Sequence, residues 1–247
     1  MPSYQLILSQ LYLAAIMKSN LPRPLVNLAK AIIIPILRNK WKRHTTVKQW
    51  IDQDMINDDE IDWLVLNWQR HGRPIPPPPK IKQKIVAEIA KNYGCKALVE
   101  TGTYKGDMIF AQLANFDELY SIELSEEFHQ QALQRFEKFP HVKLLQGDSG
   151  EELPKLTPKL KLKTLFWLDG HYCGGETAQS ALECPIYNEL KSILLENKNH
   201  VILVDDARMF NGTRDYPTLE ELNKYINQNF VNYTMKVVND VIEILPA

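Results

Sequence analysis

From residue 80 onwards, the sequence alternates between short apolar runs and longer amphipathic segments. Five short, mainly apolar runs are long enough for buried strands; they cover residues 97–100, 119–123, 142–145, 165–169 and 201–206, and all but the third end in an acid. Before and between these runs, apolar residues recur at helical spacing, as Ile81, Ile85 and Ile89 do in the segment 80–93. Strands that alternate with helices predict a parallel sheet with right-handed crossovers and helices on both faces.

The last part of the sequence has a different pattern. A helix is expected over residues 218–229, and two β-type runs follow it at 233–238 and 241–245. Only Asn239 and Asp240 separate these two runs, and a two-residue polar turn of this kind is typical of a β-hairpin. The parallel sheet is therefore predicted to end in an antiparallel hairpin.

Two apolar runs lie near the start of the chain, at residues 4–17 and 25–37. Each is shorter than the roughly 20 apolar residues that a membrane-spanning helix needs. Basic residues and Trp41 follow them, so residues 1–43 are compatible with two helices that lie on a membrane surface. The alternative is that these helices pack on the rest of the chain or on a second copy of it, as in a homodimer.

A proline-rich stretch separates the first part of the chain from the alternating pattern. Residues 45–70 are expected to be helical, and residues 71–79 contain the run Pro76 to Pro79. A helix interior or a central strand cannot include such a run, so we interpret it as an extended linker. The predicted division is a helical extension with its linker at 1–79 and an α/β domain at 80–247.

The charge of the chain limits its partners. The net charge is −1, which argues against nucleic-acid binding. Residues 1–51, however, carry eight Lys or Arg and no Asp or Glu, which favours an anionic partner for that segment, such as a lipid surface. The chain has three cysteines and no C-x-x-C pair, as expected for reduced thiols. We therefore expect a cytoplasmic protein, with peripheral attachment to the inner face of a membrane left open.

The first strand leads into a turn that contains two glycines. The sequence from Glu100 to Gly106 has the spacing E-x-G-x-x-x-G. It lacks the central glycine of G-x-G-x-x-G, which a dinucleotide needs for its pyrophosphate, so a nicotinamide-dependent oxidoreductase is disfavoured. Glycine at Gly102 and Gly106 would let the backbone approach a ligand closely.

A second acidic residue is placed to bind a nucleoside. Glu123 ends the second predicted strand and lies about 20 residues after Gly102. An acid in this place accepts hydrogen bonds from the two ribose hydroxyls of an adenosine ligand. This geometry is shared by sites for NAD and for S-adenosylmethionine (SAM).

Taken together, these features resemble the class I SAM-dependent methyltransferases over about residues 80–247. The resemblance implies a Rossmann-like α/β fold whose seven-stranded sheet has the order 3-2-1-4-5-7-6. It also implies a SAM site, in which Asp148 after the third strand meets the adenine amino group. The cofactor-binding residues implied in this way are Glu100, Thr101, Gly102, Thr103, Tyr104, Gly106, Glu123, Asp148, Ser149 and Asp169.

The acids after the fourth and fifth strands resemble those of the metal-assisted O-methyltransferases of the macrocin and catechol type. The resemblance implies Mg²⁺ at Asp169, Asp205 and Asp206, which fits the preference of this ion for oxygen ligands. Three converging carboxylates would raise one another's pKa values unless a cation neutralised them. A bound Mg²⁺ could hold two substrate hydroxyls and activate one of them.

His171 is the candidate general base, with Asp169 two residues before it as the other catalytic residue. The macrocin-type pattern has a second acid where this chain has His171, so the alternatives for this histidine are a metal ligand, a base or a loop residue, and the metal itself stays open. We therefore expect a SAM-dependent methyltransferase that acts on the oxygen of a hydroxylated small molecule or glycan, with Mg²⁺ assistance open. The alternative is a SAM-fold binding or scaffold protein without methyl transfer, because a fold does not decide a function.

Overall fold

The computed structural model describes residues 59–170, 184–196 and 198–247. Contacts divide the chain into two compact units, residues 1–72 and 73–247. Helix α4 (Asp59–Arg70) belongs to the first unit, and every strand of the described residues belongs to the second. The expected boundary after residue 79 stays a prediction, and the expected membrane or subunit contact of residues 1–43 lies outside the described residues.

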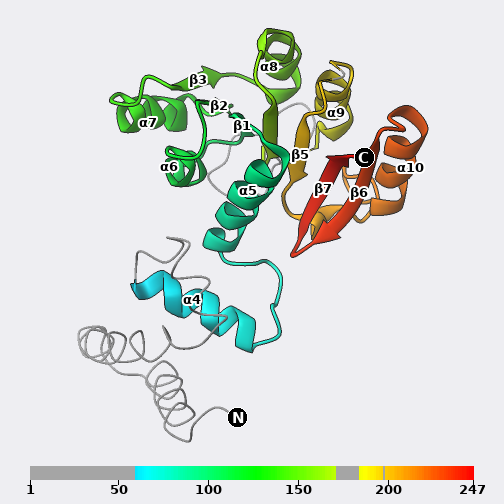
Figure 1. Ribbon diagram of the computed structural model, residues 1–247, viewed down its shortest axis with the longest axis horizontal. Coiled ribbons are helices and arrows are strands. Elements are labelled where there is room, and N and C mark those ends of the chain that lie inside the picture. Colours follow the sequence, from blue (N-terminus) through cyan, green and yellow to red (C-terminus); the bar gives the residue numbers. More distant parts are fainter. Residues whose placement is uncertain (1–58, 171–183, 197) are drawn as a thin grey trace, which may run out of the picture. The chain divides into compact units, whose positions relative to one another are not determined.

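The second unit is built on one seven-stranded sheet (Figure 1). The strands are β1 (Ala97–Thr101), β2 (Glu118–Glu123), β3 (Val142–Gln146), β4 (Thr164–Leu168), β5 (Val201–Val204), β6 (Tyr233–Val238) and β7 (Val241–Pro246). Their order is β3-β2-β1-β4-β5-β7-β6, and β7 runs antiparallel to both of its neighbours while the other pairs are parallel. The predicted strand order and the antiparallel hairpin at the end are both confirmed.

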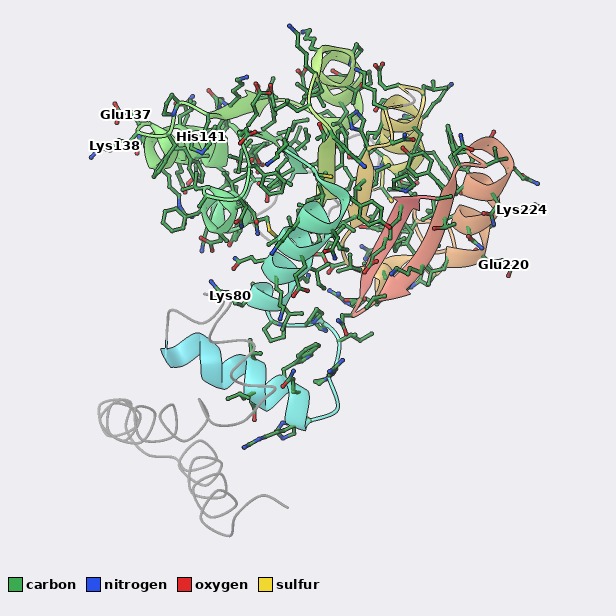
Figure 2. All side chains as sticks on the ribbon, viewed as in Figure 1. Lys80, Glu137, Lys138, His141, Glu220 and Lys224 are labelled. Atoms are coloured by element: carbon green, nitrogen blue, oxygen red, sulfur yellow. The ribbon has the colours of Figure 1, made fainter. Side chains whose placement is uncertain are left out.

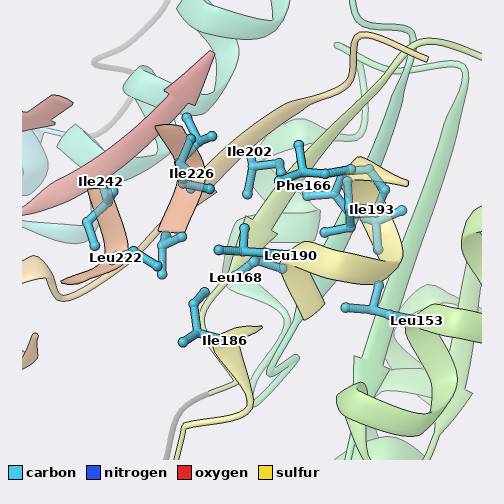
Figure 3. Packing of buried hydrophobic residues seen from close by; sticks show 14 of the residues in the cluster. Leu153, Phe166, Leu168, Ile186, Leu190, Ile193, Ile202, Leu222, Ile226 and Ile242 are labelled. Carbon is cyan, nitrogen blue, oxygen red and sulfur yellow. The ribbon is translucent and has the colours of Figure 1, made fainter. Parts of the chain in front are cut away.

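Helices cover both faces of this sheet. They are α5 (Pro79–Tyr93), α6 (Asp107–Gln112), α7 (Glu126–Phe136), α8 (Ser149–Leu156), α9 (Ile186–Leu194) and α10 (Leu219–Asn229), with short 3₁₀ turns η1 (Thr157–Lys159) and η2 (Ala207–Met209). Successive strand residues point to opposite faces, so Phe166 packs with α8, α9 and α10, whereas Trp167 packs with α5, α6 and α7. Figure 3 shows the first of these clusters, in which Leu153, Leu190 and Ile226 surround the sheet residues Phe166 and Ile202.

The outer helix faces are charged. On α10, Leu222 and Ile226 are buried, whereas Glu220 and Lys224 are exposed and point away from the sheet (Figure 2). This division follows the helical period of the sequence, in which positions three or four apart share a face. No helix in the described part of the chain is long and apolar enough to cross a membrane.

Helix α8 was not expected from the sequence pattern. Pro154 lies inside it and has no backbone N–H to donate to the preceding turn. The helix forms nevertheless, because Asp148 caps its start through a 2.8 Å hydrogen bond from the backbone N–H of Gly150, and because Leu153 and Leu156 are buried. This helix follows β3 directly and therefore fixes the chain at the carboxyl end of that strand.

The hairpin turn is tied to the end of β5. Asn239 and Asp240 have φ angles of 50° and 65°, as a type I′ turn requires at both central positions. The backbone N–H of Ala207 donates to the carbonyl of Asp240 at 2.8 Å, and that of Arg208 donates to its side-chain Oδ1 at 2.9 Å. The hairpin thereby holds the short η2 turn that follows the acid pair of β5.

Candidate functional site

The carboxyl ends of the parallel strands are aligned by backbone hydrogen bonds that continue beyond the strands themselves. These bonds run from Gly102 N to Ile122 O at 2.9 Å, from Gly147 N to Glu123 O at 2.9 Å, from Asp169 N to Thr101 O at 3.1 Å and from Asp205 N to Leu168 O at 3.0 Å. The turns therefore leave the sheet at a common edge. In open α/β sheets, ligands bind at this edge, and the predicted acids lie along it.

Glu123 is held at the end of β2 by two backbone donors. Its Oε2 accepts from the N–H of Tyr104 at 2.8 Å, and its Oε1 accepts from the N–H of Ser125 at 2.8 Å. The residue is 7% exposed, so its orientation is fixed in a largely buried setting. Each carboxylate oxygen can accept more than one hydrogen bond, so the two oxygens keep capacity for a pair of ligand hydroxyls.

Tyr104 itself has a backbone conformation that is uncommon for a residue with a side chain. Its φ is 47°, and this left-handed conformation turns its N–H toward Glu123. The residue is 41% exposed, and its ring meets that of Phe128 edge-on, with 4.8 Å between ring centroids. The turn after β1 thus presents an exposed aromatic ring beside the Glu123 carboxylate.

Gly102 has a packing reason that the sequence did not reveal. Its φ is +82°, and a Cβ built on it would lie 2.6 Å from the backbone oxygen of Asp169. The side chain of Thr101 holds the same neighbouring turn, because its Oγ1 accepts from the N–H groups of Asp169 and Gly170 at 3.2 and 3.1 Å. The glycine therefore allows the turns after β1 and β4 to pack together, and its predicted role in ligand approach stays a prediction.

A buried chain of hydroxyl groups runs beneath this turn. Ser121 Oγ lies 2.6 Å from Glu100 Oε2 and 2.6 Å from Thr103 Oγ1, and both contacts are hydrogen bonds. Burial raises the pKa of Glu100 to about 8, against the opposing effect of the Ser121 hydrogen bond. Glu100 is therefore protonated at neutral pH and supports the turn as a neutral group.

The side chains of the two predicted cofactor residues after β3 make hydrogen bonds within the chain. Asp148 caps α8, and Ser149 Oγ donates to Glu189 Oε1 at 2.7 Å. Glu189 is fully buried, its Oε2 has no hydrogen-bond partner among the described residues, and burial raises its pKa to about 7. The sequence analysis missed Glu189, since a single acid within an amphipathic helix is usually exposed.

The acids after β5 form an ion-pair cluster with a lysine from α5. Lys82 Nζ lies 2.5 Å from Asp205 Oδ2 and 3.1 Å from Asp206 Oδ1. Arg208 Nη1 donates to the same Asp206 oxygen at 2.8 Å and also pairs with Asp240. The second oxygen of Asp205 accepts from the backbone N–H of Asp206 at 2.7 Å.

The charges of this cluster shift the pKa values of its members in different directions. Burial and the nearby Asp205 raise the pKa of Asp169, and burial raises the pKa of Asp205 to about 6 despite Lys82. Burial would also raise the pKa of Asp206, but Lys82 and Arg208 outweigh it, and the pKa is lowered. Burial would lower the pKa of Lys82, but Asp205 outweighs it, and the lysine stays an ammonium.

The fit of a magnesium ion can be judged from the donors present. Among the described residues, no group of three or more His, Cys, Asp or Glu side chains is placed to hold a metal ion. Asp205 and Asp206, two of the three predicted ligands with Asp169, direct oxygens at Lys82 instead. These residues do not fit the predicted ion. His171, the predicted base, lies outside the described residues.

Lys82 was invisible to sequence reasoning for a physical reason. It is one of three lysines, with Lys80 and Lys84, in the first turns of α5, and lysine side chains are usually exposed. Its partners are 123 and 124 residues away, and only the tertiary fold brings them together. The only sequence signal for it was the acid pair Asp205–Asp206, which indicates a nearby cation. The sequence analysis took that cation to be a metal ion.

No protein-family model matches the sequence, and no curated protein matches it. Solved structures do match. The O-methyltransferase TomG from Streptomyces achromogenes, solved with SAM, aligns at 15% identity and a TM-score of 0.54 over 84% of this chain and 98% of its own. An O-methyltransferase from Bacillus cereus, solved with S-adenosylhomocysteine (SAH), aligns at 14% identity and a TM-score of 0.51, over 85% of this chain and 100% of its own. The SAH-bound Podospora anserina methyltransferase PaMTH1 aligns at 15% identity and a TM-score of 0.51, over 100% of this chain and 98% of its own.

At these identities the likeness establishes the fold. The chain has the Rossmann-like fold of class I SAM-dependent methyltransferases, with the sheet order and terminal hairpin described above.

Proposed function

We propose that this chain is a SAM-dependent methyltransferase that transfers a methyl group to a hydroxyl oxygen of a small molecule or glycan. The observation that carries the proposal is Glu123, a nearly buried carboxylate fixed by two backbone N–H groups at the end of β2. Its remaining acceptor capacity suits the two hydroxyls of a ribose. The neighbours solved with SAM or SAH share this fold and support the proposal.

The donor set around Glu123 also fits the rest of SAM. The turn from Thr101 to Gly106 would lie along the methionine part, and Asp148 would accept a hydrogen bond from the adenine amino group. Glu100, neutral because of its raised pKa, would keep Ser121 and Thr103 in place beneath that turn. The carboxylates at this edge suit a cationic, hydroxyl-rich ligand better than a diphosphate.

The reaction requires positioning more than covalent chemistry. SAM supplies a methyl group on a sulfonium, which an acceptor oxygen attacks in line, giving SAH, the methylated oxygen and one proton. The protein's contribution is to hold the acceptor hydroxyl opposite the sulfur and to receive its proton. We assign His171 as the base that receives this proton, and Asp169, which directly follows β4, as the other catalytic residue.

The proposal is tested first by binding and then by turnover. SAM and SAH are titrated calorimetrically into the full chain, and SAH release is then measured with catechol, simple phenols and monosaccharide glycosides as acceptors. We expect micromolar binding of both cofactor forms and SAH release that depends on acceptor. Binding without release for any acceptor would favour the scaffold alternative, and no binding of either compound would reject the proposal.

A further inference from the structure

Helix α5 delivers a single cationic side chain into the acid cluster at the carboxyl edge of the sheet. The Lys82 side chain is 16% exposed and that of Asp205 is 2% exposed, so the ion pair between them is largely shielded from water. A shielded pair is screened little by salt and holds its geometry. Lys82 is therefore a built-in part of this edge.

The ammonium group uses the oxygens that a metal ion would need. Lys82 contacts Oδ2 of Asp205 and Oδ1 of Asp206 at 2.5 and 3.1 Å. Magnesium binds oxygen at about 2.0–2.1 Å in near-octahedral geometry, so an ion on Asp205 Oδ2, which lies 2.5 Å from the ammonium nitrogen, would be at most about 4.6 Å from that nitrogen. The two cations would repel each other at that separation.

Two of these carboxylate oxygens have further donors. Asp205 Oδ1 accepts from the N–H of Asp206, and Asp206 Oδ1 is shared with Arg208. A divalent ion could take the two oxygens that Lys82 contacts only if Lys82 left, and the lysine would then lose both of its carboxylate partners in a mostly buried setting. Leaving a buried charge unpaired costs more than the pair itself contributes, so displacement is unfavourable.

We propose that the Lys82 ammonium takes the place of a divalent cation at the Asp205–Asp206 cluster and positions these carboxylates without a metal. Two consequences follow. The cluster does not bind Mg²⁺ or Mn²⁺ while Lys82 is present, and methyl transfer needs no added metal. The second consequence rests on the proposed function, whereas the first does not.

The binding consequence can be tested with Mn²⁺, followed by electron paramagnetic resonance of the free ion. The proteins compared are the wild type, Lys82→Met, Lys82→Arg and Lys91→Met. Methionine keeps the length of the lysine without its charge, and arginine keeps the charge. Lys91 lies on the exposed surface near the end of the same helix and is the matched control.

We expect only Lys82→Met to gain Mn²⁺ binding, by about tenfold or more over the wild type, because the like charge is gone. Adding Asp205→Asn to Lys82→Met should remove the gained binding. If Lys82 had only a structural role, replacing it would not create a metal site, and the methionine and arginine variants would not differ in Mn²⁺ binding. If Lys82→Met gains no binding while it stays folded by circular dichroism, the proposal is wrong.

A second test starts from the wild type and does not depend on the Lys82 variants. Stoichiometric Mn²⁺ binding to the wild type that Asp205→Asn abolishes would overturn the proposal. For activity, turnover unchanged by EDTA supports it, and turnover that EDTA abolishes and Mg²⁺ restores overturns it. If no acceptor is methylated at all, the proposed function fails, and the Mn²⁺ titration still decides the role of Lys82.

Discussion

The backbone N–H of Tyr104 donates a 2.8 Å hydrogen bond to Oε2 of Glu123, and this bond joins the turn after β1 to the tip of β2. Both the donor and the acceptor belong to residues that the sequence analysis assigned to the cofactor. The bond shows that Glu123 has a role within the protein before any ligand binds, because it fixes the left-handed turn at Tyr104. We therefore expect binding of the proposed cofactor at Glu123 to be coupled to the shape of this turn.

Replacing Glu123 with glutamine should weaken SAH binding by about tenfold to a hundredfold, the effect of losing a hydrogen bond to a charged group. Glutamine has one acceptor oxygen, so either the N–H of Tyr104 or that of Ser125 would face an amide donor. Calorimetric titration of SAH into the variant measures the loss.

Glu126→Gln is the control for this change. Glu126 lies three positions further along, is exposed at the start of α7 and loses the same charge. Equal affinities for the two variants would mean that charge near the site, and not the Glu123 contact, governs binding.

Gly102→Ala should destabilise the protein by about 2 kcal/mol or more. The positive φ alone costs about 1–2 kcal/mol for a residue with a Cβ, and that Cβ would also lie 2.6 Å from the Asp169 backbone oxygen. The free energy of unfolding, from urea denaturation monitored by tryptophan fluorescence, measures the change.

Gly94→Ala separates the two contributions. Gly94 has a φ of +66° at the end of α5, but a Cβ there would have nothing within 4 Å. The loss of stability in Gly94→Ala should therefore measure only the cost of the positive φ. If Gly102→Ala costs no more than Gly94→Ala, the turns after β1 and β4 do not pack as tightly as described.

The apolar pattern was sufficient to predict the strands and the acids at their ends, because a buried strand is a continuous apolar run and its end is marked by the first charged residue. The order of the strands in the sheet was predicted from the resemblance to a known family. Leu168 followed by Asp169 and Val204 followed by Asp205 are such boundaries. The pattern could not predict α8, since Pro154 and a length of two turns hide its period. Local patterns thus predict which elements form and where their ends lie.

Partners across the fold were beyond the sequence. Glu123 could be placed at the sheet edge, but its two backbone donors could not be identified, because they depend on the conformation of the turn at Tyr104. Similarly, the acid pair indicated a cation, yet the choice between a metal ion and Lys82 depends on how α5 packs beside β5. The residue types therefore indicated what kind of partner each acid needs, but the sequence did not indicate which residue supplies it.

Asp240→Ala should destabilise the protein by about 2–3 kcal/mol. The change removes the acceptor of the Arg208 N–H and an ion-pair partner of its guanidinium, and a partly buried donor left without its partner costs about 1–3 kcal/mol. Asn239→Ala is the matched control, because Asn239 also has a positive φ in the same turn. Urea denaturation compares the two variants, and equal losses would mean that Asp240 matters only as a turn residue.

The neutral state of Glu100 predicts a pH dependence of stability. Its pKa is about 8 in the folded protein and has an ordinary value of 4.5. Between these values the unfolded chain has lost the proton and the folded chain still holds it, so the free energy of unfolding falls as pH rises, by at most about 1.4 kcal/mol per pH unit. Below 4.5 both states are protonated, and above about 8 both have lost the proton, so the contribution is constant on either side of this window.

Glu100→Gln removes this titration and keeps an acceptor oxygen for Ser121. The variant should therefore gain stability relative to the wild type as the pH rises from about 5 to about 8, by up to a few kcal/mol. Glu189, whose raised pKa acts in the same direction, is present in both proteins and cancels in the difference. Urea denaturation across this range measures the difference, with the exposed Glu126→Gln as the control. Parallel curves for wild type and Glu100→Gln would mean that Glu100 is ionised in the folded protein at neutral pH.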